Sequence, residues 1–332
     1  MARLNARRIV VTGGTGFIGA HAAGALAAEG AEVCVLDIAP LRDESAYVLR
    51  SHAPRVWLGG ANDWAQTLAC VKEFGATDIV HLGAIGDPGP LHRNPQLALT
   101  VNLQGTVNVL EAARLFGLQR VVYFSSIGVL PSVRYEPIDA AHPVLLPGEG
   151  PGSGAYGASK VAGEAFCFAY RQSYGVDFAI IRPSAVYGLG MRHPIFVKPM
   201  VEGAVRAEPV RLANGGTFPR DYTYVGDIAS LTVALVEATE LDTRIYYGAT
   251  GRPLVTGREL ATAVARVVDG ADIEIEDALT PADELELRGR GVLSVEANER
   301  ELGWRPRYSL EDGLREYADG YRQYLSESMR TS

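Results

Sequence analysis

The chain has 332 residues, of which 47% are hydrophobic and 21% are charged. These values are ordinary for a globular protein, and the length suits one large core with a smaller appended lobe. The formal net charge of −8 argues against nucleic acid or an anionic membrane as the main partner, because both attract basic surfaces.

The three cysteines of the chain are scattered through apolar segments and lack the spacing of metal ligands. We therefore expect Cys34, Cys70 and Cys167 to be buried, reduced thiols in a cytoplasmic protein without a metal site. Residues 1–8 are basic but lack the apolar region of a signal peptide, and no apolar run has the length of a membrane span. We expect no membrane partner.

The first half of the chain alternates short apolar runs with helical patterns, and helices are predicted at 17–29 and 97–116. Near-continuous apolar strands separated by helices predict an α/β fold with a doubly wound parallel sheet of the Rossmann type. The predicted strands are 8–12, 32–37, 56–58, 78–82 and 120–125.

Beyond residue 183 the strict alternation fades and prolines punctuate the chain. This change predicts a smaller, mixed α/β C-terminal lobe, with later helices at 256–268 and 310–325. We expect one lobe to comprise residues 1–183 plus about 222–247, and the smaller lobe to comprise 184–221 and 248–330.

A glycine-rich turn follows the first predicted strand and opens the first predicted helix, with the sequence Thr-Gly-Gly-Thr-Gly-Phe-Ile-Gly at 12–19. Gly13, Gly16 and Gly19 remove side chains where the turn is tight, where a pyrophosphate approaches the backbone, and where helix packs on strand. The helix N-terminus then offers unpaired N–H donors to the phosphates. The turn predicts a dinucleotide site.

Asp37 closes the second predicted strand, at the distance from the turn where an acid accepts hydrogen bonds from an adenosine ribose. Its carboxylate would repel a 2′-phosphate, so this position favours NAD over NADP. The alternative is a residue that only stabilises the turn at the strand end.

Tyr156 and Lys160 lie four residues apart where a helix begins, so they share one helix face. A free phenol has a pKa of about 10, too high for a base at neutral pH. A nearby ammonium and a positive nicotinamide ring favour the phenolate, so we expect Lys160 to lower the pKa of Tyr156 and to bond the nicotinamide ribose. Ser126, just past the strand 120–125, can hold the substrate oxygen that gains or loses the proton.

With these residues, the chain resembles the extended short-chain dehydrogenase/reductase family in its NAD-dependent epimerase/dehydratase branch, which includes nucleotide-sugar epimerases. The similarity runs over nearly the whole chain and keeps the family's order of motifs. Besides the turn at 12–19, the similar segments are His81-Leu-Gly-Ala84, 102–113, Ser125-Ser126, Tyr156-x-x-x-Lys160, Arg182-Pro183, 220–229 and 302–306.

The resemblance implies a site in which Ser126, Tyr156 and Lys160 are catalytic and in which Ser126, Tyr156 and Arg220 contact the substrate. It also implies a homodimer that pairs the helices around 97–116 and 156–174. The implied cofactor contacts are Gly13, Gly16, Phe17, Ile18, Gly19, Asp37, Asp63, Leu82, Gly83, Ala84, Asn102, Ser125, Tyr156, Lys160 and Pro183.

Three departures from the family pattern bear on the substrate. Ile127 and Gly128 stand where sugar dehydratases carry acids, so elimination of water lacks its acid and base. Ala185 replaces an asparagine that commonly seats a nucleotide-sugar phosphate, paired asparagines are missing from 193–200, and 129–131 read Val-Leu-Pro instead of Val-Tyr-Gly.

Arg220, with Arg288 or Arg290 as candidate helpers, offers a guanidinium fork that suits phosphate or carboxylate. The alternative is an ion pair of Arg220 with Asp221 or Asp227.

Three functions remain open at this stage. The first is an NAD-dependent nucleotide-sugar epimerase that transiently oxidises a sugar hydroxyl, and the second is a dehydrogenase of a sugar, sugar acid or other secondary alcohol without a nucleotide. The third is a non-catalytic dinucleotide sensor, against which the intact Ser126, Tyr156 and Lys160 argue.

Overall fold

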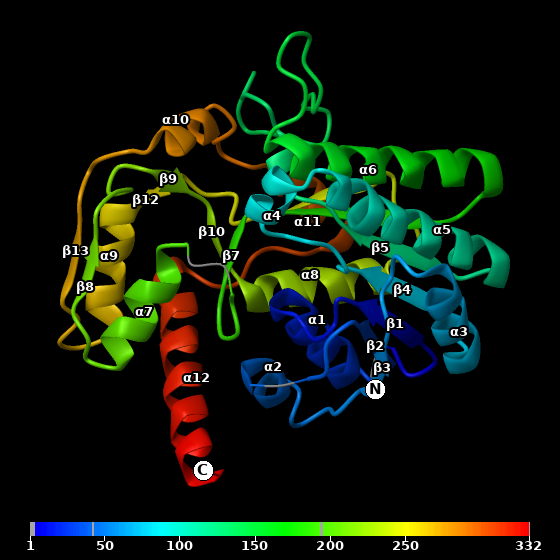
Figure 1. Cartoon of the computed structure of the whole chain (residues 1–332), viewed down its shortest axis with the longest axis horizontal. Coiled ribbons are helices and arrows are strands. Elements are labelled where there is room, and N and C mark those ends of the chain that lie inside the picture. The colour runs from blue at the N-terminus through cyan, green and yellow to red at the C-terminus, as the bar shows by residue number, and fades with distance from the viewer. Residues whose placement is uncertain (1–3, 42, 193–194, 332) are drawn as a thin grey trace.

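The computed structural model describes residues 4–41, 43–192 and 195–331. Figure 1 shows a large sheet covered by helices, with a smaller lobe beside it from which the C-terminal helix descends. The sheet has seven parallel strands in the order β11-β6-β5-β4-β1-β2-β3. Their bounds are β1 Arg8–Thr12, β2 Glu32–Asp37, β3 Arg55–Leu58, β4 Asp78–His81, β5 Arg120–Phe124, β6 Phe178–Pro183 and β11 Ile245–Gly248.

Successive residues of the strands enter opposite faces of the sheet, and both faces are buried. Val11 belongs to the core shared with helices α1 (Phe17–Ala28) and α8 (Val225–Glu237). Its neighbour Val10 belongs to the core shared with α3 (Trp64–Phe74), α5 (Gln104–Phe116) and α6 (Gly154–Tyr174). Strands buried on both faces explain the near-continuous apolar runs in the sequence, and the predicted doubly wound fold is confirmed.

The order of strands reverses between β1 and β4, because the chain moves from β1 to β2 and β3 on one side and then returns to β4 on the other. Doubly wound folds bind their ligands outside the carboxyl ends of the strands at such a switch point. The glycine turn follows β1, and the segment His81-Leu-Gly-Ala84 begins at the end of β4. The fold therefore brings these two motifs side by side.

Local chemistry sets several helix ends. The side chain of Thr256 accepts a hydrogen bond from the Glu259 N–H, and Glu259 returns one to Thr256, which is a capping box at the start of α9 (Gly257–Val267). Gly117 and Gly175 end α5 and α6 in the left-handed region, with φ of 63° and 72°. The predicted helix 97–116 begins with a π-helical segment, Ala98–Leu103, that continues into α5.

In the described residues, the smaller lobe is built from three two-stranded sheets and four helices that enclose a second core around Met200, Leu260 and Tyr317. One pair of strands is antiparallel and two are parallel, as a mixed α/β lobe requires. The pairs are β7 (Ala185–Tyr187) with β10 (Tyr222–Tyr224), β9 (Pro219–Arg220) with β12 (Val255–Thr256), and β8 (Val210–Leu212) with β13 (Ile273–Ile275). The helices are α7 (Val197–Val205), α9, α10 (Pro281–Leu287) and α12 (Leu310–Thr331).

The chain crosses between the two cores more than once. α8 packs on α1, and β11 pairs with β6, so both belong to the larger lobe. The helix α11 (Glu296–Leu302) belongs there too, because Leu302 packs on the core that contains Trp304. The division of the sequence into 1–183 plus 222–247 and 184–221 plus 248–330 stays a prediction. Two further short helices in the described part of the chain are α2 (Asp43–Val48), which packs on α1, and α4 (Pro88–Arg93), which packs on α6.

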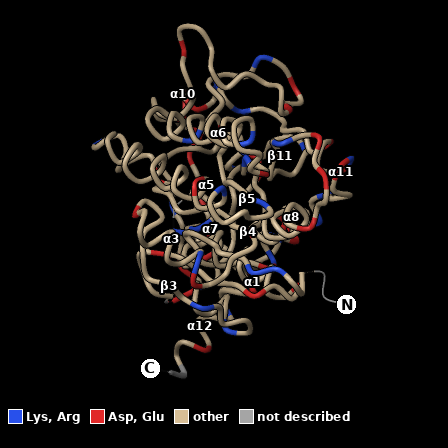
Figure 2. The backbone as a smooth tube through the Cα atoms, turned by 90° about the vertical axis from the view of Figure 1, so that its right-hand side faces the viewer, with Lys and Arg blue, Asp and Glu red and all other residues tan. Residues whose placement is uncertain are grey.

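Acidic and basic residues are interspersed along the backbone, as Figure 2 shows. Among the described residues, no helix has the length and apolar character needed to cross a membrane, and no group of three or more metal-ligating side chains could hold an ion.

Candidate active site

The glycine turn places backbone N–H groups at the switch point. Gly13 has a φ of 68°, and a Cβ there would lie 2.9 Å from the Gly83 nitrogen of the neighbouring strand end. A Cβ on Gly19 would lie 2.2 Å from the Gly13 oxygen, so α1 can pack on the turn only without a side chain. Gly16 is the N-cap of α1, and in its described first turn no side chain caps the N–H groups and no acid is present.

These features fit a dinucleotide whose pyrophosphate lies on the N-terminus of α1, because the donors and the helix dipole both favour an anion there. The backbone of Phe17 and Ile18 opens the helix, while their side chains turn away to pack on the two cores. A groove of about 420 Å³ runs beside the turn, lined by Thr15, Phe17, Ala39, Asp43, Glu44, Ser45, Gly190 and Arg192.

The two predicted acidic contacts of the cofactor also have local hydrogen bonds. Asp37 accepts from the backbone N–H of Thr15 at 3.1 Å and of Ala39 at 3.3 Å, so it ties the end of β2 to the turn. Asp63 is exposed and caps α3 by accepting from the Gln66 N–H at 3.0 Å. Both carboxylates keep lone pairs for a ligand, and their contacts with an adenosine stay a prediction.

The end of β4 is braced by a buried polar chain. The Thr12 hydroxyl lies 2.6 Å from Nδ1 of His81 and accepts from the Gly83 N–H at 3.0 Å. Burial and the charge of Lys160 lower the pKa of His81 to about 3, so this imidazole is neutral. Asn102 bonds both backbone groups of Ile85, at 2.8 and 3.3 Å, and so holds the segment Leu82, Gly83, Ala84 in place.

Ser126, Tyr156 and Lys160 converge at the carboxyl end of β5. Ser126 follows that strand, and its hydroxyl caps the short 3₁₀ turn Ile127–Val129 by accepting from the Gly128 N–H at 2.9 Å. A Cβ on Gly128 would lie 3.2 Å from both Ser126 Oγ and Tyr156 Cε1, which shows how closely the two side chains approach. Gly128 thus keeps the space between them open.

Lys160 lies one helical turn beyond Tyr156 and is buried. Its ammonium donates to the carbonyl oxygen of Phe124 at 2.7 Å and lies 5.9 Å from the ring centroid of Tyr156. Burial lowers the pKa of Lys160 to about 8, and the nearby carboxylate of Glu164 opposes that change.

The pKa of Tyr156 in the protein without a cofactor is set mainly by burial. Burial raises this pKa, and hydrogen bonding with Ser126 partly opposes the rise. The ammonium of Lys160 is bonded to the Phe124 carbonyl and lies 5.9 Å from the Tyr156 ring centroid. The expected lowering of this pKa by Lys160 together with a bound nicotinamide stays a prediction.

The Ser125 hydroxyl is bonded within the protein, and the predicted contact of Ser125 with the cofactor stays a prediction. Its hydroxyl donates to Glu164 at 2.5 Å, and Glu164 in turn receives two hydrogen bonds from Arg182, at 2.9 and 2.7 Å. Sequence reasoning missed Glu164, although an acid four residues after Lys160 on one helix face was a signal for it. Pro183, next to Arg182, lies at the carboxyl end of β6 beside β11.

Arg220 lies in the smaller lobe beside a second guanidinium. Arg220 and Arg290 stack on the ring of Phe218, with Cζ atoms 4.5 and 5.6 Å from its centroid. Their side chains are 14% and 15% exposed, and both bond the single carboxylate of Glu286. Burial, and then the charge of Arg290, lowers the pKa of Arg220. Two partly buried cations thus share one acid.

The alternative ion pairs of Arg220 are not formed. The Asp221 carboxylate accepts from Ser184, Thr223 and Thr250, and that of Asp227 accepts from the backbone of Arg307 and Tyr308. The Nε atoms of Arg220 and Arg290 and the Tyr222 hydroxyl are buried without a hydrogen-bond partner in the described part of the chain. Arg288, the other candidate helper, is exposed.

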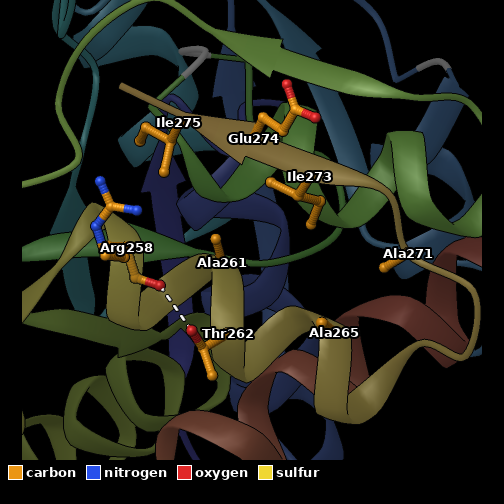
Figure 3. A pocket seen from close by; sticks show the side chains of 8 residues that line it. All are labelled: Arg258, Ala261, Thr262, Ala265, Ala271, Ile273, Glu274 and Ile275. Carbon is orange, nitrogen blue, oxygen red and sulfur yellow. Dashed lines mark hydrogen bonds between the residues drawn. The ribbon is translucent and has the colours of Figure 1, made fainter. Parts of the chain in front are cut away.

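A separate groove of about 440 Å³ lies on the smaller lobe between α9 and β13. Figure 3 shows its lining, which includes Arg258, Thr262 and Glu274, with the Thr262 hydroxyl bonded to the Arg258 carbonyl on the same helix. None of the predicted site residues lines this groove.

Comparison with known proteins gives consistent results. The family model described as "NAD dependent epimerase/dehydratase family" matches residues 9–247. A UDP-glucose 4-epimerase of Mycolicibacterium smegmatis is 30% identical over 327 residues, covering 95% of this chain and 98% of the relative. A putative GDP-L-fucose synthase of Oryza sativa subsp. japonica is 34% identical, and the match covers 77% of this chain and 75% of the relative.

Solved structures show the same likeness. A UDP-glucose 4-epimerase of Thermus thermophilus in complex with NAD is 32% identical with a TM-score of 0.76, and the match covers 95% of this chain and 99% of that one. A UDP-glucose 4-epimerase of Thermotoga maritima, at 24% identity and a TM-score of 0.81, shares the fold.

Proposed function

Because the chain belongs to the NAD-dependent epimerase/dehydratase family, we propose that it is an epimerase of a nucleotide sugar that works by transient oxidation of a sugar hydroxyl. It is an enzyme of the extended short-chain dehydrogenase/reductase type, and its cofactor is NAD. A non-catalytic sensor is therefore not retained. The observation that carries the proposal is the convergence of Ser126, Tyr156 and Lys160 at the carboxyl end of β5, on the same edge of the sheet at which the glycine turn follows β1.

Each of the three side chains has a distinct part in the proposed reaction. Ser126 holds the reacting hydroxyl oxygen, and Tyr156 takes its proton and later returns it. Lys160, fixed by the Phe124 carbonyl, orients the nicotinamide ribose. When bound, NAD supplies reversible acceptance of hydride. The Gly13–Gly19 turn and Asp37 hold the pyrophosphate and the adenosine ribose.

The paired arginines favour a substrate with a diphosphate. Arg220 and Arg290 give the smaller lobe two partly buried cations with unpartnered Nε atoms, bonded to the one carboxylate of Glu286. Asp283 is a further acid near Arg220. Guanidinium groups bind phosphate oxygens in bidentate geometry. Two of the similar proteins are UDP-glucose 4-epimerases, which agrees with a nucleotide diphosphate in the substrate.

A second candidate is an NAD-dependent dehydrogenase of a sugar, sugar acid or other secondary alcohol without a nucleotide. Its support is Ala185, which opens β7 opposite Tyr222 and has no side-chain amide to seat a phosphate. A carboxylate of a smaller substrate would also suit Arg220. The two candidates differ in whether reduced cofactor accumulates.

The decisive experiment measures retained cofactor and products in the purified protein. It is incubated with UDP-sugars and, separately, with free sugar acids, while absorbance reports NADH and chromatography reports the sugars. Interconversion of UDP-sugars without net NADH supports the epimerase. NADH that accumulates with a free sugar acid supports the dehydrogenase, and the absence of turnover on both panels contradicts the proposed reaction.

We also propose a homodimer that pairs α5 and α6 and operates in the cytoplasm, where the free cysteines Cys34, Cys70 and Cys167 stay reduced. These adjacent helices expose several large apolar side chains, and such patches mark interfaces. Light scattering should give the dimer mass, and Phe166→Glu should give the monomer. The exposed fractions are Leu115 49%, Phe116 40%, Phe166 39%, Phe168 44% and Tyr174 59%.

A further inference from the structure

A buried charged network lies directly behind the catalytic lysine. Glu164 on α6 accepts from the Ser125 hydroxyl at 2.5 Å and from two nitrogens of Arg182 at 2.9 and 2.7 Å. Arg182 also donates to the Tyr247 hydroxyl at 3.1 Å. The network therefore joins the carboxyl ends of β5, β6 and β11 to one position on α6.

Stability of the fold alone does not account for the buried ion pair of Arg182 and Glu164. The exposed fractions are 2% for Arg182 and 5% for Glu164, so both charges have lost most of their water. The desolvation cost of such a pair commonly cancels its attraction, and well-packed apolar side chains of the same volume serve stability as well or better. A role in holding the site gives the buried charges a reason to be present.

Glu164 lies one helical turn beyond Lys160, on the same face of α6. The groups that face the ammonium from β5 are the Phe124 carbonyl at 2.7 Å and the Tyr123 ring, whose centroid is 5.2 Å away. From β4 it faces the neutral His81, and from its own helix the ring of Tyr156.

Arg182 on β6 is bonded to Glu164. Among these groups, the carboxylate of Glu164 is the negative charge that acts on the Lys160 ammonium.

We propose that Glu164 is a positioning residue, whose carboxylate holds the ends of β5 and β6 against α6 and keeps the Lys160 ammonium in place beside Tyr156. The inference rests on the proposed role of Lys160 in the reaction. Ser126 is the residue after Ser125, so the same contact also sets where the substrate-binding hydroxyl lies.

Two opposing effects on the pKa of Lys160 agree with this arrangement. Burial lowers the pKa of Lys160 to about 8, and Glu164 is the charged group that opposes the fall. Without that carboxylate the pKa falls further, and the ammonium is lost as pH rises through a lower value. Lys160 would then lose a large part of its charge near neutral pH.

The test is direct because the chain has only three lysines, Lys72, Lys160 and Lys198. With ¹⁵N-labelled lysine, nuclear magnetic resonance follows each Nζ against pH in the intact protein, and Lys160→Arg assigns the signal. Glu164→Gln should lower the pKa of Lys160 by about one unit, a tenfold change in its protonation equilibrium. It should also move the alkaline limb of the kcat/KM profile to lower pH by the same amount.

Two further variants keep the test decisive. Glu164→Gln combined with Arg182→Met removes both buried charges, so it folds without an unpaired cation, and it should still lower the pKa of Lys160. Glu111→Gln, at an acid of α5 whose side chain is 27% exposed, should change neither the titration nor the profile.

An unchanged Lys160 titration in both Glu164 variants, with only a lower melting temperature, would overturn the proposal and leave Glu164 as a packing residue. Failure of the proposed function is seen separately, as turnover that survives Lys160→Met.

Discussion

At the scale of single residues, the environment of Tyr156 decides what the site can do. Its phenol is in a buried setting that raises its pKa, with Ser126 as the partner that partly opposes this rise. Lys160 lies near but is bonded to a backbone carbonyl. We expect the base role of Tyr156 to depend on the positive charge of a bound nicotinamide together with that of Lys160.

Tyr156→Phe should abolish proton transfer, because the ring then lacks its hydroxyl, while NAD affinity stays within about threefold. Removal of one catalytic acid or base typically lowers kcat by a factor of about 100 to 10,000. Turnover assays and calorimetric NAD titration measure the two effects. Preserved turnover would disprove the assignment of Tyr156, and Tyr174→Phe, at the exposed end of the same helix, is the matched control.

Asp37→Ala should weaken NAD binding by about tenfold, since a hydrogen bond to a charged group contributes about 1.5 kcal/mol. The same change should relax the rejection of NADP, because the carboxylate no longer repels a 2′-phosphate. Titrations with both cofactors give the ratio of dissociation constants. Glu32→Gln, at the exposed start of the same strand, is the control, and an unchanged NADP affinity would argue that Asp37 only ties β2 to the turn.

At the scale of elements, polar contacts fix how helices meet the sheet edges. Glu301 of α11 accepts from the N–H groups of Asp242 and Thr243 and from the Tyr246 hydroxyl at 2.6 Å, and so ties α11 to the start of β11. Burial favours the neutral form of Glu301, but these hydrogen bonds outweigh it and lower its pKa to about 2.

Glu301→Gln should therefore destabilise the protein in a pH-dependent way. A carboxyl group with a depressed pKa in the folded state contributes stability above its unfolded pKa of about 4.3, and this contribution is lost as pH falls through about 2. Urea unfolding at pH 7 should show a lower midpoint for the variant, and the gap should narrow as the pH falls below about 4 and close near pH 2. Equal midpoints at pH 7 would contradict this, and Glu299→Gln is an exposed control on the same helix.

At the scale of the whole molecule, the C-terminal helix bridges the two lobes. Figure 1 shows α12 descending beside α2, and the rings of Tyr324 and Tyr47 meet there with centroids 5.6 Å apart. Tyr47 also donates to Gln323 at 3.3 Å. Because α2 lines the groove beside the glycine turn, α12 supports one wall of that groove, where we expect the cofactor to bind.

Tyr324→Ala should lower stability by about 1 kcal/mol, as expected for a half-buried aromatic side chain, and the melting temperature by a few degrees. It should also weaken NAD binding several-fold, because α2 loses its support. Scanning calorimetry and NAD titration measure both effects. Met329 is 75% exposed on the same helix, so Met329→Ala should change neither the melting temperature nor NAD binding. Equal NAD affinities in the two variants would show that α12 does not stabilise the cofactor site.

Much of the fold could be predicted because its signals are local. The ends of β1 and β2 agree with the prediction to the residue, since buried parallel strands read as apolar runs and end at turn residues. The glycine turn and the Tyr156–Lys160 spacing were also visible, because both depend on neighbours along one element. These local signals were sufficient to predict a Rossmann sheet and to locate a candidate site.

The sequence by itself determined the strand–helix alternation, the dinucleotide turn and the residue types of the site, because periodicity and short spacing are properties of a single element. Only the tertiary structure decided the partners: Glu286 and Arg290 for Arg220, Glu164 for Ser125, and the Phe124 carbonyl for Lys160. Those contacts join segments distant in the chain, and the burial that shifts each pKa exists only once the sheet and helices have packed.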